Sequence, residues 1–317
     1  MIMNKKITSF FKLIRWSNLL ITAIMMLLIY YCVMSPLSSI GIAEVMPSSP
    51  AFTLLLGSII FIVAGGYVIN DIFDVEIDKV NKPNKLLITN VFSEKEAKLF
   101  YKTLTFLGLL CGLISSIIIL KSKFYTFFAP LVLLTCLLYS YSANYKKKLI
   151  IGNVIVSISV AFAVFLPWLF EILYLSNNTL ILSSVKEILP SILPFILIYT
   201  AFAFIITLIR EIVKDAEDYK GDMITRCRTL PIVIGIKKTK IILYLLTFCL
   251  YALLIYFHII LIKNQANIAL CMLFATETGS LLSIINIYNS KESSDFHKVS
   301  VALKISMVFG ILTMIFI

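Results

Sequence analysis

The chain alternates between long apolar stretches and short polar segments, which is the pattern of a protein that crosses a membrane many times. Nine stretches hold about 20 mostly apolar residues each, the length that a helix needs to cross a bilayer. They lie at residues 16–34, 51–70, 103–120, 124–144, 150–170, 188–209, 241–262, 266–287 and 299–317. Because backbone polar groups in lipid need hydrogen bonds within their own segment, each stretch is predicted to be an α-helix. The predicted fold is all-α, a single bundle of nine transmembrane helices around a central cavity, forming one domain over residues 1–317.

The composition agrees with this pattern and excludes several other classes of protein. Hydrophobic residues make up 60% of the 317 residues and charged residues 14%. Soluble domains are nearer ~45–50% apolar and ~25% charged. A soluble globule, a disordered chain, a coiled coil and a small disulfide scaffold are therefore excluded.

The distribution of lysine and arginine predicts the orientation in the membrane. With the N-terminus inside, 23 of the 28 basic residues fall in inside segments, four fall outside, and Lys304 lies within the last stretch. Cytoplasmic loops carry such an excess of Lys and Arg. We therefore expect residues 1–15 to be a cytoplasmic N-terminal segment and the C-terminus to lie on the opposite side. The net charge of +11 then reflects topology, and no nucleic-acid partner is expected.

Acidic residues gather in two clusters at the predicted cytoplasmic ends of the second and sixth stretches. The first consists of Asn70, Asp71, Asp74, Glu76 and Asp78, and the second of Glu211, Asp215, Glu217, Asp218 and Asp222. Many members are three or four residues apart, so on a helix each cluster would form a row on one face. A row of like charges is costly unless a cation sits in it, and Mg²⁺ binds carboxylates together with phosphates and water. One such cluster can be a solvated loop, but two on the same side favour a metal and phosphate site.

Basic residues lie next to both acidic clusters. Lys82 and Lys85 follow the first, while Arg210, Lys214 and Arg228 lie within or after the second. Such residues bind anionic groups near metals, although the topology alone also predicts basic residues here.

The residues of the two clusters resemble the motifs of the UbiA superfamily of intramembrane prenyltransferases. The run NDIFDVEIDKVNKP at 70–83 resembles the first aspartate motif of that family. The run REIVKDAEDYKGD at 210–222, followed by RTLP at 228–231, resembles the second. The nine helices and the positions of both motifs also agree with the family, so the resemblance covers the whole chain.

The resemblance implies a fold, a cofactor and a set of site residues. Two Mg²⁺ ions would be bound, one by Asn70, Asp74 and Asp78 and the other by Asp218 and Asp222. The implied catalytic residues are Asp71, Asp74, Asp78, Asp215, Asp218 and Asp222. Arg15 with Asn18, and Lys146 to Lys148 with Asn153, resemble further family motifs. The implied substrate-binding residues are Arg15, Asn18, Lys82, Lys85, Lys146, Lys148, Asn153, Arg210, Lys214 and Arg228.

The implied reaction is the transfer of a prenyl group from a prenyl diphosphate to a hydrophobic acceptor within membrane lipid. The allylic C–O bond breaks, pyrophosphate leaves with its charge neutralised, and the acceptor attacks the carbon. The second motif looks most like the branch that contains digeranylgeranylglyceryl phosphate synthases, which favours a glyceryl-phosphate-type acceptor. An aromatic acceptor of the hydroxybenzoate or naphthoate type, as in quinone-precursor enzymes, is the alternative.

Two classes outside enzymes of this kind remain as alternatives. A secondary transporter would use acidic residues to bind ions or substrate, but transporters favour charged sites near the bilayer midplane. Here the midplane charge is nearly confined to Glu277, which we expect to orient an acceptor or to pair with a buried polar group. The alternative is a protonated acid that is hydrogen-bonded to neighbours such as Thr276 or Thr278. A catalytically silent scaffold would not need to keep two rows of carboxylates. A local signal, Ser93 followed by Glu96, predicts a capping box that begins a helix.

Overall fold

The computed structural model describes residues 2–38, 49–81, 86–146, 148–224, 227–290 and 292–317. Within these ranges the chain is helical, and its only β-type pairing is a bridge between Ile88 and Phe92. Nine helices in the described residues are long and apolar enough to span a membrane. The predicted all-α, multi-pass architecture is confirmed, while the expected cavity at the centre of the bundle stays a prediction.

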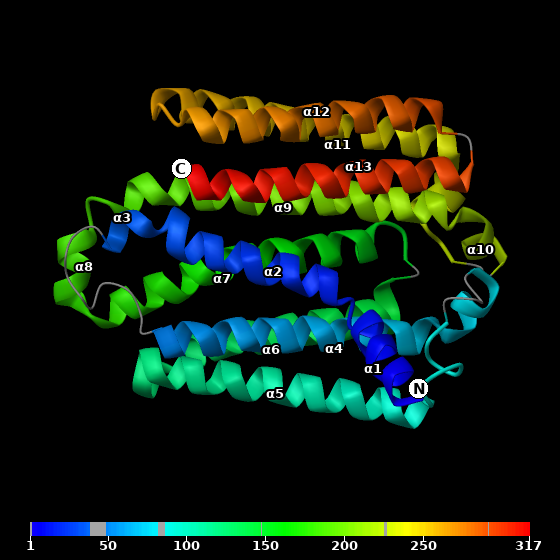
Figure 1. Cartoon of the computed structure of the whole chain (residues 1–317), viewed down its shortest axis with the longest axis horizontal. Helices are drawn as coiled ribbons and strands as arrows, with labels where there is room; N and C mark the ends of the chain where they lie inside the picture. Colours follow the sequence, from blue (N-terminus) through cyan, green and yellow to red (C-terminus); the bar gives the residue numbers. More distant parts are fainter. Residues whose placement is uncertain (1, 39–48, 82–85, 147, 225–226, 291) are drawn as a thin grey trace. The chain divides into compact units, whose positions relative to one another are not determined.

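Thirteen α-helices follow one another within the described ranges, and Figure 1 labels them in chain order. They are α1 (Ile2–Leu13), α2 (Trp16–Leu28), α3 (Ser35–Ser38), α4 (Ser49–Asn81), α5 (Glu94–Leu120), α6 (Tyr125–Ser140), α7 (Ile151–Asn177), α8 (Thr179–Val185), α9 (Leu189–Glu217), α10 (Tyr219–Ile224), α11 (Leu230–Lys263), α12 (Asn267–Asn289) and α13 (Ser293–Leu312). Helix α2 continues into a π-helical turn at Ile29–Val33, and α6 into another at Tyr141–Tyr145.

The helices extend beyond the apolar stretches that predict them. Helix α4 continues to Asn81 and α9 to Glu217, so residues of both acidic clusters lie on helices rather than in loops. An apolar run marks the part of a helix that suits lipid, whereas the backbone hydrogen bonds continue into water wherever the residues permit it. The acidic side chains that lie on these helices are therefore spaced as on a helix.

The chain divides into two compact units, which are described separately. Unit 1 contains Met1–Met26, Pro36–Tyr145 and Leu166–Leu189, and unit 2 contains Leu27–Ser35, Lys146–Phe165 and Pro190–Ile317. Helix α7 contributes its first part to unit 2 and the remainder to unit 1. The single domain expected over residues 1–317 stays a prediction.

In unit 1, α4 and α5 approach each other closely through small residues on α5. A Cβ atom added at Gly108 would lie 3.0 Å from the backbone nitrogen of Ile62 and 3.1 Å from the carbonyl oxygen of Ser58. The Ser115 hydroxyl on the same helix donates to the carbonyl of Ala51 at 2.7 Å. Small residues permit such close contacts between membrane helices, where packing replaces the hydrophobic effect.

A buried apolar cluster in unit 1 supports the segment that carries the first acidic cluster. It includes Leu13 of α1, Val68 and Val75 of α4, and Phe92. Val68 lies two residues before Asn70, and Val75 lies within the acidic cluster, next to Asp74. Packing at both positions fixes the helix where its polar residues begin.

Helix α5 begins at the capping box that the sequence predicts. The backbone nitrogen of Glu96 donates to the Ser93 hydroxyl at 3.2 Å, and the backbone nitrogen of Ser93 donates to the Glu96 carboxylate at 2.8 Å. These reciprocal bonds satisfy two donors that a helix start leaves unpaired. The capping-box prediction is confirmed.

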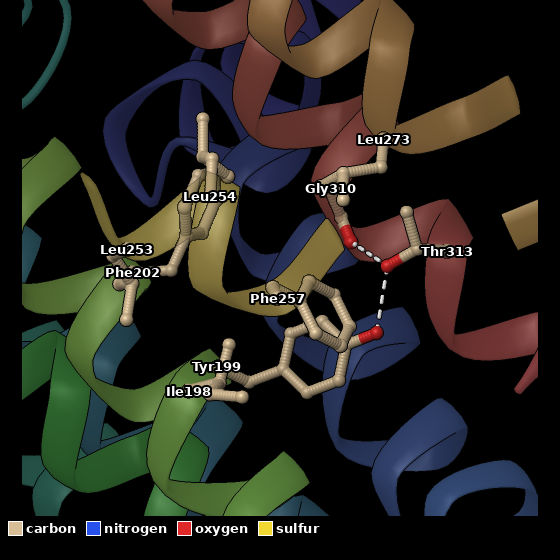
Figure 2. A pocket seen from close by; sticks show the side chains of 9 residues that line it. All are labelled: Ile198, Tyr199, Phe202, Leu253, Leu254, Phe257, Leu273, Gly310 and Thr313. Carbon is tan, nitrogen blue, oxygen red and sulfur yellow. Dashed lines mark hydrogen bonds between the residues drawn. The ribbon is translucent and has the colours of Figure 1, made fainter. Parts of the chain in front are cut away.

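In unit 2, a narrow apolar pocket lies among α9, α11, α12 and the end of α13, and it has one polar corner (Figure 2). The Thr313 hydroxyl donates to the carbonyl of Gly310 at 2.7 Å, and it lies 2.6 Å from the Tyr199 hydroxyl. A hydroxyl has one proton to donate, so Tyr199 is the donor to Thr313. Because Tyr199 and Thr313 are buried, this pair satisfies hydroxyl groups that would otherwise destabilise the core.

Glu277 lies inside a predicted membrane span, and Glu171 lies one residue beyond the end of another, within the apolar span of α7. Glu277 pairs with His258 of unit 2, whose Nδ1 is 3.3 Å from the Glu277 carboxylate. The hydroxyls of the expected neighbours Thr276 and Thr278 donate to the carbonyls of Met272 and Ala275, so the partner is a histidine that the sequence did not indicate. Glu171 of unit 1 is fully buried, and neither carboxylate oxygen has a hydrogen-bond partner among the described residues. The sequence analysis did not single out Glu171, because it follows a long apolar run and no neighbouring polar pattern marks it.

Candidate active site

The first acidic cluster lies on one uninterrupted helix in unit 1. Asn70 and Asp74 are four residues apart on α4, and both are buried, with 7% and 5% of their surface exposed. The Asn70 amide nitrogen donates to Asp74 at 2.7 Å and approaches Asp71 at 3.5 Å. Asp78 follows one turn later on the same helix and is half-buried. The side-chain oxygen of Asn70 and the carboxylates thus form the row that the spacing predicts.

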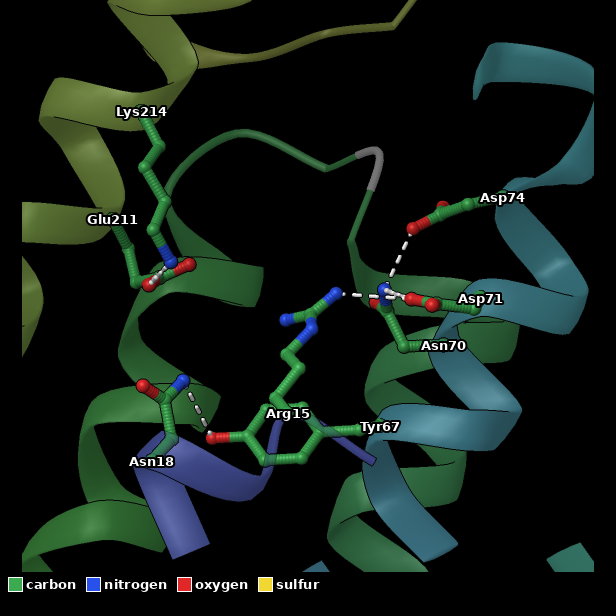
Figure 3. A network of polar contacts seen from close by, with 8 residues as sticks. All are labelled: Arg15, Asn18, Tyr67, Asn70, Asp71, Asp74, Glu211 and Lys214. Atoms are coloured by element: carbon green, nitrogen blue, oxygen red, sulfur yellow. Dashed lines mark hydrogen bonds and ion pairs between the residues drawn. The ribbon is translucent and has the colours of Figure 1, made fainter. Parts of the chain in front are cut away.

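Arg15 and Asn18 belong to the surroundings of the first cluster. Figure 3 shows the Arg15 guanidinium reaching Asp71, with Nη2 2.9 Å from the carboxylate. The same guanidinium lies 4.7 Å from the centre of the Tyr67 ring, and Asn18 donates to the Tyr67 hydroxyl at 3.3 Å. These contacts place Arg15 and Asn18 beside the acidic row, where the sequence expected substrate-binding groups.

The chain turns at Arg15 in a strained backbone conformation. Arg15 lies between α1 and α2 and has a φ of 52°, a left-handed conformation that costs an ordinary residue roughly 1 kcal/mol or more. Its ion pair with Asp71 is partly exposed on both sides and is worth about 1 kcal/mol at most. The cation–π contact with Tyr67 adds a comparable amount. Together the two contacts offset the strained turn and direct the guanidinium toward Asp71.

The second acidic cluster, in unit 2, crosses a helix boundary. Helix α9 ends at Glu217, Asp218 joins it to α10, and Asp222 is buried in α10. The expected single helical row from Asp215 to Asp222 is therefore wrong in this respect. Gly221 is unfavourable in the middle of a long helix, and Asp218 is a favoured residue type immediately before a helix start. Both residues therefore favour a helix boundary at this point.

Hydrogen bonds continue across this boundary. The backbone nitrogen of Asp218 donates to Lys214 at 2.8 Å, and the Asp218 carbonyl accepts from Gly221 at 3.1 Å and Asp222 at 3.0 Å. The backbone nitrogen of Cys227 then donates to the carbonyl of Asp222 at 2.9 Å. Asp218 and Asp222 thus remain one helical turn apart even though two helices meet between them.

A residue of α7 binds Asp215, the aspartate that precedes this boundary. The Asn153 amide donates to the Asp215 carboxylate at 2.8 Å, and Asn153 is buried. Lys214 directly precedes Asp215, and its ammonium forms an ion pair with Glu211, about one turn earlier on α9 (Figure 3). A carboxylate that accepts a hydrogen bond from a buried amide is fixed in orientation. The structure therefore brings together Asn153 and Asp215, which the sequence assigned to separate motifs.

The remaining predicted basic residues occupy different settings. The Nε atom of Arg210 on α9 is buried and has no hydrogen-bond partner among the described residues, so it is a donor available to an anion. Arg228 is exposed just before α11, and Lys148 is exposed in the turn before α7. Lys146 lies at the end of the preceding π-turn and is half-buried. Lys82 and Lys85 lie outside the described residues.

The side chains of both clusters suit a hard cation. Across the described ranges, no three His, Cys, Asp or Glu side chains are gathered closely enough to hold a metal ion by themselves. Mg²⁺ does not need such a cage, because it is usually bound through one or two carboxylates and completes its shell with phosphate and water oxygens. Asn70 and Asp74 in unit 1 and Asp218 and Asp222 in unit 2 offer this oxygen-only chemistry.

Sequence reasoning missed one set of contacts beside the second cluster. The Ser293 hydroxyl of α13 donates to the carbonyl of Glu217 at 2.5 Å, and Nδ1 of His297 lies 3.1 Å from the Glu217 carboxylate. These partners lie 76 and 80 residues from Glu217. No local pattern links positions so far apart, so the only signal in the sequence was that Glu217 belongs to the acidic cluster.

Comparison with known proteins identifies relatives of this chain. A digeranylgeranylglyceryl phosphate synthase of Saccharolobus solfataricus is 36% identical over 199 residues, which cover 61% of this chain and 62% of that protein. This chain therefore spans somewhat less than two thirds of that relative.

Two solved structures are similar in fold. One, described as giving insights into digeranylgeranylglyceryl phosphate synthase in membranes, is 26% identical, with a TM-score of 0.63 and 98% of both chains covered. A UbiA homolog from Archaeoglobus fulgidus bound to GPP and Mg²⁺ is 16% identical, with a TM-score of 0.57 and coverage of 96% of this chain and 99% of that one. The second likeness supports the fold alone.

A family model gives the assignment directly. The model of the UbiA prenyltransferase family matches residues 19–308, a range that contains both aspartate motifs and nearly all the candidate spans. The resemblance seen in the two motifs is therefore confirmed, and with it the class of enzyme. The chain belongs to the UbiA prenyltransferase family.

Proposed function

We propose that this membrane protein transfers a prenyl group from a prenyl diphosphate to the hydroxyl of a glyceryl-phosphate-type lipid, with Mg²⁺-assisted loss of pyrophosphate. The observation that carries the acceptor is the Saccharolobus solfataricus relative, which is named for digeranylgeranylglyceryl phosphate synthesis. The second motif carries the same resemblance over residues 210–231. The match to the UbiA prenyltransferase family over residues 19–308 supports a prenyl diphosphate as substrate, and the two carboxylate-rich motifs support the metal.

The residues of each unit have roles in this proposal. Asn70, Asp74 and Asp78 bind one Mg²⁺, and Asp218 and Asp222 bind another. When bound, the metal neutralises the charge of the diphosphate and makes it a better leaving group. Asn70 donates to Asp74 at 2.7 Å through its amide nitrogen, and the oxygen of the same side chain is the atom that would bind the metal.

The basic residues bind the diphosphate and hold the acids in place. Arg15 fixes Asp71 through its 2.9 Å contact, and Asn153 fixes Asp215 through its 2.8 Å contact. The buried Nε of Arg210 donates to a phosphate oxygen, because a buried donor without a partner is costly until an anion arrives. Lys146, Lys148, Lys214 and Arg228 add positive charge, as do Lys82 and Lys85.

The reaction needs few further groups from the protein. The C–O bond between the allylic carbon and the diphosphate breaks, and its electron pair leaves with pyrophosphate. The acceptor hydroxyl oxygen forms the new bond to that carbon and loses its proton. The apolar helices exclude water, which would otherwise take the place of the acceptor.

The charge distribution supports a sidedness for this site. Both acidic clusters belong to the inside segments, which together hold 23 of the 28 lysine and arginine residues, and segments with such an excess are cytoplasmic. We therefore place both motifs and residues 1–15 at the cytoplasmic face and the C-terminus on the opposite side.

A transfer assay tests the proposed function. Purified protein in liposomes receives Mg²⁺, labelled geranylgeranyl diphosphate and, in separate reactions, geranylgeranylglyceryl phosphate, 4-hydroxybenzoate or a naphthoate. We expect Mg²⁺-dependent release of pyrophosphate and a labelled ether with the glyceryl phosphate acceptor. Asp74→Ala and Asp218→Ala are expected to abolish both signals.

A matched variant shows that the loss is specific. Glu76 belongs to the same cluster, but its side chain is 81% exposed and pairs with Lys79. Glu76→Gln removes one negative charge from the cluster and is expected to retain activity. A labelled product with an aromatic acceptor alone would support the quinone-precursor alternative, and no Mg²⁺-dependent use of the diphosphate would contradict the proposal.

A further inference from the structure

The first turns of α13 contact the end of α9 immediately before Asp218. Ser293 is the first residue of α13, and His297 follows one helical turn later. Residues four apart on a helix share a face, so both side chains can reach one partner. That partner is Glu217, the last residue of α9.

The backbone contact follows from the helix boundary. In a continuous helix the carbonyl of Glu217 would accept a hydrogen bond from the backbone nitrogen of Gly221. Here Gly221 donates to the carbonyl of Asp218 at 3.1 Å, so the hydrogen-bond pattern of the helix changes at this boundary. The Ser293 hydroxyl donates to the Glu217 carbonyl at 2.5 Å and satisfies a group that helix ends leave unpaired.

The side-chain contact adds a second point of attachment. Nδ1 of His297 lies 3.1 Å from the Glu217 carboxylate, and the Glu217 side chain is 22% exposed while that of His297 is 65% exposed. A single exposed contact of this kind stabilises weakly. Two contacts on the same residue fix both its backbone and its side chain, which one contact does not.

We propose that Ser293 and His297 are positioning residues that hold the α9–α10 boundary in the geometry that places Asp218 for Mg²⁺-diphosphate binding. The inference rests on the proposed function for the role of Asp218. The first motif needs no such support, because α4 continues through it without a boundary. In the second motif the backbone changes direction next to a proposed metal ligand, and α13 fixes the residue before the change.

Amide hydrogen exchange tests the attachment independently of activity. The exchange of the peptide covering residues 214–224 is measured in detergent, without ligand, for the wild type and for Ser293→Ala and His297→Ala. We expect exchange in this peptide to become about three- to tenfold faster in both variants, since each loses one hydrogen bond that holds the boundary. Peptides from α4 and α5 are expected to exchange at the wild-type rate.

Two further variants separate positioning from general damage. His297→Asn keeps a nitrogen donor near the position of Nδ1 and is expected to restore slow exchange. Lys298→Ala removes a neighbouring side chain of α13 that contacts only Asp295 in the described pairs, at 3.4 Å, and is expected to match the wild type. Equal exchange in the wild type and both alanine variants, or faster exchange throughout the chain, would overturn the inference.

The Mg²⁺ concentration for half-maximal prenyl transfer tests the role of this attachment. We expect that concentration to rise about three- to tenfold in Ser293→Ala and His297→Ala, with a smaller change in maximal rate, and to recover in His297→Asn. Faster exchange with an unchanged Mg²⁺ requirement would overturn the positioning role. A wild type that shows no Mg²⁺-dependent transfer would contradict the proposed function, while the exchange result would still decide whether α13 holds the boundary.

Discussion

The two aspartate motifs have similar residues but different backbones. In unit 1, Asn70, Asp74 and Asp78 follow each other at four-residue spacing along α4. In unit 2, Asp215 ends the row on α9, Asp218 lies at a boundary, and Asp222 lies on α10. Similar spacing in sequence therefore corresponds to one continuous helix in the first case and to two helices in the second.

The difference shows how a row of like charges is kept in place. The spacing of the first row is fixed by the continuous backbone of α4, on which Asn70 donates to Asp74, and Arg15 from outside this helix pairs with Asp71. The second row depends on other helices, since Asn153 of α7 binds Asp215 and Ser293 of α13 binds Glu217. We therefore expect the backbone of the first motif to depend mainly on α4 itself, and the backbone of the second motif to depend on residues far along the chain.

The largest effect is expected at Asp74. Asp74→Ala removes a buried carboxylate from the first row, and loss of one charge-stabilising group in an active site costs about 100-fold or more in rate. The rate of labelled ether formation at saturating Mg²⁺ measures this effect. A decrease of less than about tenfold would show that Asp74 is not a ligand of the reacting complex.

A smaller effect is expected when a supporting residue of the second motif is removed. Asn153→Ala leaves Asp215 without its amide donor and is expected to lower kcat/KM for the prenyl diphosphate about tenfold. Ser176→Ala on the same helix, where an exposed hydroxyl bonds only to the backbone of Leu173, is the control. Equal kinetics for the two variants would contradict support from α7.

A still smaller effect is expected at Arg15. Arg15→Lys keeps the charge near Asp71 but loses the planar group that stacks on Tyr67. We expect KM for the prenyl diphosphate to rise roughly threefold to fivefold, because the contact is partly exposed. If Arg15→Ala had the wild-type KM, Arg15 would have no part in the first motif.

The smallest effect on activity is expected from a change in helix packing. Gly108→Ala places a methyl group 3.0 Å from the backbone of Ile62 and is expected to destabilise unit 1 by about 1–3 kcal/mol. Gly57→Ala on α4, with no atom within 4 Å of its added methyl group, is the matched control. Thermal unfolding in detergent should show a lower midpoint for Gly108→Ala only, with little change in the Mg²⁺ requirement of either variant.

Local features of this molecule could be predicted from the sequence because they depend on neighbouring residues. The capping box of Ser93 and Glu96, the helical spacing of Asn70 and Asp74, and the apolar spans follow from periodicity and side-chain type. The helix ends could not be predicted from the sequence. The apolar residues that mark a membrane span end earlier along the chain than the backbone hydrogen bonds of the helix. The apolar stretch ends at Asn70, whereas α4 continues past Asp78 to Asn81, so the first motif forms the last turns of this helix.

Features that depend on distant residues could not be predicted. The partner of Glu277 is His258, and the partners of Glu217 come from α13; only the folded chain brings them together. Gly221 disfavours a continuous helix around Asp218, but the same residues are also compatible with an uninterrupted helix. The burial of Glu171 depends on its neighbours in space, which no single sequence reveals.

The most direct test of the two motifs as metal sites is to count the divalent ions that bind with the substrate. Mn²⁺ replaces Mg²⁺, a prenyl diphosphate analogue that cannot react is added, and bound Mn²⁺ is counted by electron paramagnetic resonance. We expect about two ions per wild-type chain and about one in Asp74→Ala and in Asp218→Ala. An ion count that neither substitution lowers would contradict the assignment of the two motifs as metal sites.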